Sequence, residues 1–230
     1  MTEIKVLSWN IRHGLTSIGI VNIEAFVEQI LKFDVDIVLL QEVDRKTKRA
    51  GYVDQYEVVK TALGFGWHGA WGTRTKIHSG QYGLATFSKY GIDIFENHLL
   101  SSIHPEKCIA QESTVYIKGI PVTIVNLHMP YDKHTGVTHM ETAWHALNEI
   151  QFPKDLIIGG DLNVLYTTPE YDVMIHECID IGYQRTTEYA RIDYCMGRGS
   201  LFPTKQVVHQ INLSDHYPFI TTFMLKPFEQ

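Results

Sequence analysis

The order of the predicted elements favours an α/β fold in which two packed sheets are flanked by helices. Strand patterns outnumber helix patterns, and the two kinds follow one another in mixed order along the chain. Most of the strand patterns also end in polar side chains. A doubly wound parallel sheet would instead alternate strand and helix regularly, so two sheets fit this order better.

The composition is that of an ordinary globular protein. Hydrophobic residues make up 44% and charged residues 20% of the 230 residues, and no linker-like stretch divides the chain. We therefore expect one domain over residues 1–230. The formal net charge of −6 disfavours a broad basic surface for nucleic acid, although it is compatible with a local basic groove.

The cysteines and the amino terminus bear on the compartment. Cys108, Cys178 and Cys195 are widely spaced, which indicates neither a disulfide framework nor a thiolate zinc site. Residues 1–9 lack the pattern of a signal peptide, and no run approaches the roughly 18 apolar residues of a membrane span. These observations predict a cytoplasmic protein without stable membrane insertion, and we expect a monomer.

The first three elements form a strand, helix, strand unit. Residues 4–10 alternate like a strand and place Asn10 at its end. Asn22 is a suitable helix cap, and apolar residues recur at helical spacing over residues 23–31. Residues 36–42 then form a buried strand that ends at Glu42. Both strands therefore finish in polar residues.

The remaining elements are mainly short strands. A second helix is predicted over residues 54–63 with Gly64 as its stop, and Lys118-Gly119-Ile120-Pro121 is typical of a hairpin turn. The other expected elements are strands over 82–88, 92–99, 114–117, 122–128, 155–160, 192–196 and 219–225, and helices over 138–150 and 169–181. Residues 213–218 form a loop before the last strand.

Polar side chains gather at the predicted strand ends, where a rigid scaffold commonly places reactive groups. They are Asn10, Glu42, Asn126, His128, Asp161, Asn163, Asp193, Asp215 and His216. Asp161 and Asn163 lie two residues apart after a glycine pair, so an extended chain would point both to one face. Taken alone, an Asp-x-Asn sequence is more often an Asx turn than a ligand site.

Together these side chains suit the hydrolysis of a phosphate ester. Carboxylate and carboxamide oxygens without thiolates favour Mg²⁺ or Mn²⁺ over a structural zinc. Two histidines beside carboxylates suit acid-base work on a water or a phosphate. Metal-assisted attack of water on a phosphate ester needs this combination and requires no serine or cysteine nucleophile.

An ordered set of motifs between residues 9 and 218 resembles the endonuclease/exonuclease/phosphatase superfamily. The motifs are Trp9-Asn10-Ile11, Leu40-Gln41-Glu42-Val43, Asn126-Leu127-His128, Gly160-Asp161-Leu162-Asn163, Ile192-Asp193-Tyr194 and Ser214-Asp215-His216-Tyr217-Pro218. The resemblance implies a four-layer α/β sandwich with the site at one edge of the two sheets. It also implies that Glu42, assisted by Asn10, binds a catalytic divalent cation close to Asp215, with Mg²⁺ expected and Mn²⁺ as the alternative.

The same resemblance implies roles for the other strand-end residues. Asp161 and Asn163 would orient the attacking water and the scissile phosphate. His216, held by Asp193, would be the general base or a phosphate contact. Either the acid or the histidine can take the water's proton, and we expect His216 to do so. His128 would bind the phosphate or assist the leaving group.

The chain departs from the family pattern at two places. Many members carry an arginine in the strand before the hairpin, where this chain has Ala110-Gln111-Glu112-Ser113. The glutamate that pairs with the first histidine in deoxyribonuclease-like members has no clear counterpart. Gln81 and Glu112 are both candidates for that partner of His128.

The expected activity is Mg²⁺-dependent hydrolysis of a small-molecule or lipid phosphodiester. A histidine at position 128 differs from the exonuclease III-like members, and the short acidic chain leaves little room for loops that grip duplex DNA. The alternatives are a metal-dependent nuclease acting on DNA or RNA and a noncatalytic binding protein on the same fold.

Three further segments have two interpretations each. Residues 45–49 could contact a phosphate, although a solvated loop is favoured. Trp67, His68 and Trp71 could form an aromatic wall for a substrate, and core packing is at least as good an interpretation. Residues 131–134 could rim the pocket, and an ordinary loop is the favoured interpretation.

Overall fold

The computed structural model describes residues 1–100, 108–130, 148 and 151–226. The loop over 131–134 and, apart from residue 148, the predicted helix over 138–150 lie outside the described residues. Within the described part, no helix is long and apolar enough to cross a membrane. The three cysteines are free and buried, and their spacing in the sequence indicated no disulfide framework.

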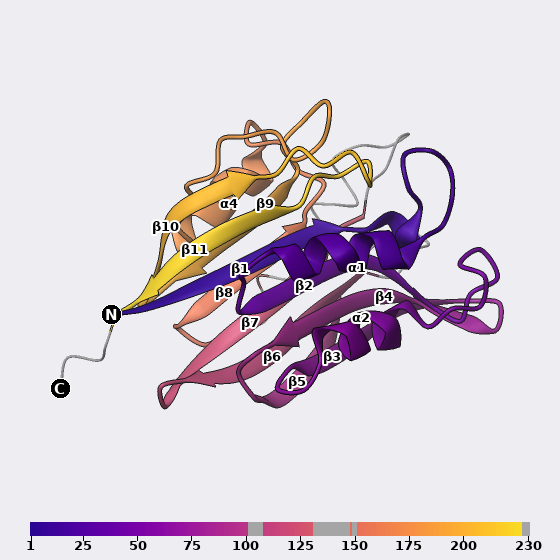
Figure 1. Ribbon diagram of the computed structural model, residues 1–230. Coiled ribbons are helices and arrows are strands. Elements are labelled where there is room, and N and C mark those ends of the chain that lie inside the picture. The colour runs from indigo at the N-terminus through magenta and orange to yellow at the C-terminus, as the bar shows by residue number, and fades with distance from the viewer. Residues whose placement is uncertain (101–107, 131–147, 149–150, 227–230) are drawn as a thin grey trace.

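The described strands form two mixed sheets (Figure 1). The six-stranded sheet has the order β10-β11-β1-β2-β4-β3, and the five-stranded sheet has the order β5-β6-β7-β8-β9. The strands are β1 (Thr2–Asn10), β2 (Ile37–Arg45), β3 (His68–Ile77), β4 (Gly80–Ser88), β5 (Ile92–Leu100), β6 (Cys108–Ile117), β7 (Ile120–His128), β8 (Leu156–Asp161), β9 (Asp193–Arg198), β10 (Leu201–Val208) and β11 (Phe219–Leu225). In each sheet one neighbouring pair is parallel, β1 with β2 and β7 with β8.

Helices cover the outer faces of both sheets. Helices α1 (Ile23–Lys32) and α2 (Gln55–Leu63) share an apolar cluster with β1, β2 and β4, whereas α4 (Pro169–Glu177) shares one with β7, β8 and β9. A third cluster lies between the sheets and joins side chains such as Val6 and Leu39 of one sheet with Ile124 and Ile157 of the other. The layers run helix, sheet, sheet, helix, which confirms the predicted four-layer sandwich.

The helix ends follow the capping chemistry of the sequence. The Asn22 side chain accepts a hydrogen bond from the Ala25 N–H at 3.1 Å, and Asp54 caps α2 in the same way. Gly64 ends α2 with φ of 82°, in the left-handed region that favours glycine. These local signals explain why both helices begin and end close to their predicted bounds.

Two strands were not predicted. β3 contains glycines and charged residues, and it exists because it pairs with β4 from His68 to Ile77, with a register shift at Arg74. β10 is an edge strand whose register shifts between Pro203 and Lys205, where the proline cannot donate a ladder hydrogen bond. Both depend on pairing partners more than on local hydrophobicity.

Most predicted boundaries differ from the observed ones by three residues or fewer, and two differ by more. β6 begins at Cys108 instead of residue 114, because Gln111 is buried between the sheets and bonds to Thr86. α4 ends at Glu177 instead of residue 181, because Ile179 turns away to pair with Gly197.

The inner faces of the two sheets change from apolar to polar toward one edge. Alternation along β1 points Val6, Ser8 and Asn10 to the inner face, and β7 does the same with Ile124, Asn126 and His128. Because β1 is parallel to β2 and β7 to β8, Asn10 lies opposite Gln41 and His128 lies opposite Asp161. The polar strand ends of both sheets therefore meet at this edge.

Candidate active site

Glu42 is turned toward this edge by an irregularity in β2. The register between β2 and β4 shifts between Leu40 and Val43, and Glu42 has φ of 56°, which non-glycine residues rarely adopt. Such a bulge re-aims a side chain, and strain of this kind often occurs at functional sites. Asn10 Nδ2 donates to Glu42 Oε1 at 3.2 Å. Burial alone would raise the pKa of Glu42, but the neighbouring His13, His128 and Asn10 lower it to about 2.

Asp161 ends β8 and is 2% exposed. The preceding Gly160 has φ of 133°, and a Cβ there would clash with the Leu127 carbonyl oxygen, so glycine is required for β8 to lie against β7. Asn10 Nδ2 also donates to Asp161 Oδ2 at 2.9 Å, and it thereby links Asp161 to Glu42 across the two sheets. Burial and the nearby Asp193 raise the pKa of Asp161.

Asn163 forms the Asx turn that the sequence pattern allows, and it also lines the site. Its backbone N–H donates to Asp161 Oδ1 at 3.0 Å, and its φ is 51°. Its Nδ2 donates to the Met129 carbonyl at 2.9 Å, which fixes the orientation of the amide. The same backbone conformation therefore forms the Asx turn and places Asn163 at the cavity.

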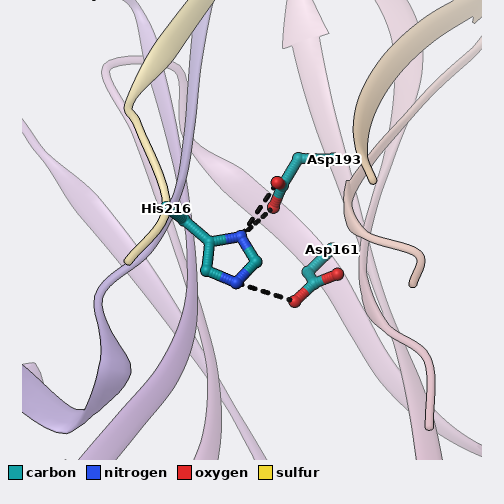
Figure 2. Close-up of side chains that lie close together, drawn as sticks. All are labelled: Asp161, Asp193 and His216. Atoms are coloured by element: carbon teal, nitrogen blue, oxygen red, sulfur yellow. Dashed lines mark hydrogen bonds and ion pairs between the residues drawn. The ribbon is translucent and has the colours of Figure 1, made fainter. Parts of the chain in front are cut away.

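His216 lies between two buried carboxylates (Figure 2). Its Nδ1 is 2.9 and 3.1 Å from the two Asp193 oxygens, and its Nε2 is 3.7 Å from Asp161 Oδ2. Trp9 Nε1 donates to the His216 carbonyl at 3.0 Å, which ties the loop before β11 to β1. Burial alone would lower the pKa of His216, but Asp193 and Asp161 raise it to about 10.

His128 does not have the expected partner. Gln81 accepts a hydrogen bond from Trp71 Nε1 at 3.1 Å, and Glu112 lies 2.6 Å from His98, so both candidates were wrong. His128 Nδ1 instead lies 2.9 Å from Arg74 Nη1. Burial and the positive charge of Arg74 lower the pKa of His128 to about 3. Nothing in the alternation of β3 distinguished Arg74 beforehand.

Two other strand-end residues lie outside this group. Asp215 is half exposed, pairs with Arg12 at 3.3 Å and accepts a hydrogen bond from Ser214 at 3.0 Å. Asn126 is fully buried between the sheets, where it accepts from Gln41 Nε2 at 2.8 Å and donates to the Ala85 carbonyl at 3.1 Å. Asn126 therefore joins the two sheets behind the site.

A cavity of about 580 Å³ lies over these groups. Five of the predicted site residues line it together with five others: Glu42, His128, Asp161, Asn163 and His216, and Arg49, Arg74, Thr75, Ile77 and Tyr82. A second cavity, of about 920 Å³, shares His216 and includes Arg12, Tyr189 and Asp215. His216 is therefore accessible from both cavities.

The basic segment at 45–49 contributes one arginine to the cavity. Arg49 is held there by two hydrogen bonds to the buried Asp44, at 2.7 and 2.8 Å. Arg45 instead pairs with Asp54 at 2.9 Å, away from that cavity. Lys46, Lys48 and Arg49 are exposed, as the solvated-loop interpretation expects, and Arg49 also lines the cavity.

The aromatic segment packs in the core. Trp67 and Trp71 contact the apolar cluster beneath α1 and α2, and Trp71 meets Tyr56 edge to face at 5.9 Å. Core packing is therefore confirmed for the two tryptophans, whereas His68 is exposed, and none of the three lines the cavity over the site.

The donor chemistry fits a hard divalent cation. Glu42 is ionised over the neutral range, and Asn10 joins it to the carboxylate of Asp161. Asp161, Asp193 and His216 form a second group, in which one ligand atom of each lies within 4.8 Å of the others. Asp193 is engaged by the imidazole of His216, so the oxygen-rich pair of Glu42 and Asp161 suits Mg²⁺ or Mn²⁺ better.

Comparisons with solved structures show the same fold in several proteins. An endonuclease/exonuclease/phosphatase from Bacteroides vulgatus is 18% identical, with a TM-score of 0.80 over 98% of this chain and 100% of that one. The human Nocturnin catalytic domain with bound sulfate anion is 19% identical, with a TM-score of 0.77 over 97% and 94%. D. rerio TDP2 complexed with a single-strand DNA product is 15% identical, with a TM-score of 0.73 over 97% and 100%. At these identities the likeness concerns the fold.

The sequence was also compared with family profiles and curated proteins. No curated protein matches the chain. The profile of the Endonuclease/Exonuclease/phosphatase family matches residues 7–216, which is most of the chain and includes every predicted site residue. The match confirms the resemblance seen in the motifs and, with it, the expectation of a metal-dependent phosphoric ester hydrolase. The chain belongs to the endonuclease/exonuclease/phosphatase family.

Proposed function

We propose that this protein hydrolyses a phosphodiester of a small molecule or a lipid head group, with Mg²⁺ as its cofactor and water as the nucleophile. The observation that carries the proposal is the convergence of Glu42, Asp161 and the Asp193–His216 pair on one cavity. Paired carboxylates beside an oriented imidazole are what metal-assisted attack of water on phosphorus requires.

Glu42 would hold the cation, and Mn²⁺ could substitute for Mg²⁺. Asn10 would assist by orienting the carboxylates of Glu42 and Asp161 through its Nδ2, and Asp215 would act from the adjoining cavity that shares His216. When bound, the ion would polarise the phosphoryl oxygens and offset their charge. Asp161 and Asn163 orient the water and the scissile phosphate. His216, oriented by Asp193, is the proposed acceptor of the water's proton, for which the charge of the bound cation would have to lower its pKa from the value of about 10 set by Asp193 and Asp161. Because the pKa of Asp161 is also raised, Asp161 is the alternative acceptor.

The shape of the site favours a diester over a monoester. A phosphodiester carries an ester group on each side of phosphorus, and the two cavities that meet at His216 offer space for both. Arg49 and Arg74 line one cavity, and Arg12 lies in the other, so each side holds at least one guanidinium. A cavity of about 580 Å³ suits a small molecule or a head group.

The first test is hydrolysis of bis(p-nitrophenyl) phosphate beside p-nitrophenyl phosphate, in Mg²⁺, Mn²⁺ or EDTA. The wild type should turn over the diester faster than the monoester, and EDTA should abolish both activities. His216→Ala should lose about 10²-fold or more in kcat, whereas His176→Ala, on the exposed face of α4, should match the wild type. Turnover that persists in EDTA would overturn the proposal.

A nuclease is the second candidate, because arginines beside a phosphate site suit a nucleic-acid backbone as well. Cleavage of plasmid or single-stranded DNA in Mg²⁺, lost in Asp161→Ala, would support it. A noncatalytic binding protein on this fold would be expected to have lost Glu42, Asp161 or His216, and all three are present. Absence of turnover on a broad phosphoester panel would favour that third function.

We also propose a cytoplasmic monomer with one domain over residues 1–230. Three free, buried thiols suit a reducing compartment. Light scattering after gel filtration and cell fractionation test these two expectations, and a dimer or a secreted product would contradict them.

A further inference from the structure

The contact between Arg74 and His128 joins the two sheets inside the site. Arg74 comes from β3 of the six-stranded sheet, and His128 ends β7 of the five-stranded sheet. Their side chains are 2.9 Å apart, from Arg74 Nη1 to His128 Nδ1, and the two residues are 4% and 6% exposed. The partner of the Nδ1 atom of this histidine is therefore a cation, where a carboxylate was expected.

The direction of the hydrogen bond follows from the chemistry of the two groups. A guanidinium has five N–H donors and no acceptor, so His128 Nδ1 must accept. An imidazole whose Nδ1 accepts carries its proton on Nε2 and is neutral. That Nε2 lies 3.6 Å from Asp161 Oδ2 and 3.9 Å from Glu42 Oε1, so its N–H lies inside the site, and His128 lines the cavity.

We propose that Arg74 is a positioning residue that fixes His128 as an Nε2–H donor to a phosphoryl oxygen of the substrate. The inference rests on the proposed phosphoesterase function and selects one of the two roles expected for His128. A histidine held this way binds the phosphoryl group but has no second proton to give to the leaving oxygen. With a guanidinium at Nδ1, where a carboxylate was expected, His128 acts as a fixed hydrogen-bond donor and not as a proton donor in catalysis.

Other side chains hold Arg74 in a cationic wall of the cavity. Two guanidiniums lie near the Tyr82 ring, whose centroid is 5.0 Å from Arg49 Cζ and 5.9 Å from Arg74 Cζ. Arg49 is in turn fixed by the buried Asp44. Arg49, Arg74 and Tyr82 line the same cavity as His128. The two guanidiniums favour binding of an anionic oxygen of the substrate at this wall.

The tautomer of His128 can be measured without any turnover. In ¹⁵N-labelled wild type, imidazole spectra should show Nδ1 without a proton and Nε2 with one, with the His128 signals assigned by their loss in His128→Gln. Arg74→Lys keeps a donor and should keep this tautomer, whereas Arg74→Met should lose the preference. A wild-type His128 with its proton on Nδ1 would overturn the inference, even if the protein proves to be a phosphoesterase. If Arg74→Met fails to fold, the wild-type and lysine spectra still decide.

Kinetics then distinguish a positioning role from a structural one. Arg74→Met and His128→Gln should each lower kcat/KM by about 10²-fold, and the double variant should lose little more than either single variant. Arg74→Lys should recover part of the loss. The single-variant losses should be similar for aryl and alkyl diesters, because the leaving oxygen receives no proton from His128. Additive losses, or a much larger loss for alkyl esters, would overturn the inference, and exposed Arg185→Met serves as the matched control.

Discussion

Asp193→Asn removes one charge beside His216 and keeps the shape of the side chain. The two Asp193 oxygens lie 2.9 and 3.1 Å from Nδ1, and the side chains of Asp193 and His216 are 2% and 12% exposed. Asparagine can still accept a hydrogen bond from Nδ1–H, but as a neutral group. The variant therefore tests the charge of the pair more than its packing.

The size of the effect follows from the pKa of His216. Its rise from 6.5 to about 10 corresponds to roughly 5 kcal/mol of preference for the protonated form in the folded state. Asp161 contributes a part of this, and the asparagine keeps a neutral hydrogen bond. We therefore expect Asp193→Asn to lower the free energy of unfolding by about 2–3 kcal/mol near pH 6.

The effect must depend on pH in a fixed direction. A pKa that is raised on folding contributes stability that is complete below the unfolded value of 6.5 and is lost as the pH rises through about 10. Since the wild type loses this contribution and the variant has little of it to lose, the difference between them should shrink steadily from about pH 6 to about pH 10.

Urea unfolding in EDTA, followed by tryptophan fluorescence at several pH values, measures this difference. Asp180→Asn is the matched control, because Asp180 is buried against Arg191, which stays charged throughout this range. Its effect on stability should change little with pH. If the difference in free energy of unfolding between the wild type and Asp193→Asn is constant, or grows with pH, the claim that Asp193 stabilises a protonated His216 is refuted.

Two further substitutions test the metal site and the strand that carries Asp161. Glu42→Gln should leave the melting temperature in EDTA nearly unchanged. It should remove the stabilisation by Mg²⁺, which for the wild type is about 2.7 kcal/mol when Mg²⁺ is in hundredfold excess over its Kd. A large drop in the melting temperature of the variant in EDTA would instead mark Glu42 as structural. Gly160→Ala should lower the free energy of unfolding by more than about 2 kcal/mol, because its Cβ would meet the Leu127 carbonyl and its φ is 133°. Gly91→Ala, with open space around its Cβ, is the control, and equal effects at the two glycines would contradict the packing argument.

The elements that local patterns define were predictable from the sequence. Helices α1 and α2 begin directly after Asn22 and Asp54, whose side chains cap them, and alternation located β1 and β7. β3 was missed because glycines and charged residues hide its alternation, and only pairing with β4 makes it a strand. Sequence patterns report local preference, whereas edge strands depend on partners that lie far away along the chain.

The candidate site divides in the same way. Glu42, Asp161 and His216 were found because polar residues at strand ends stand out against apolar runs. Arg74 was missed because it lies in the middle of an unpredicted strand. Its role follows from its contact with His128, which lies on the other sheet. Asn126 is likewise a polar residue at the end of an apolar run, but it points to the inner face of the sheet, where it is buried against Gln41.

Turnover of a phosphodiester in H₂¹⁸O tests the central claim most directly. With Mg²⁺ present, the wild type should place one ¹⁸O on the phosphorus of the product and none in the released alcohol, because water attacks phosphorus. Asp161→Asn should lower this rate by about 10²-fold or more while the protein stays folded. Label in the alcohol, or labelled product formed equally fast in EDTA or by Asp161→Asn, would contradict the assignment of a metal-dependent phosphodiesterase to this site.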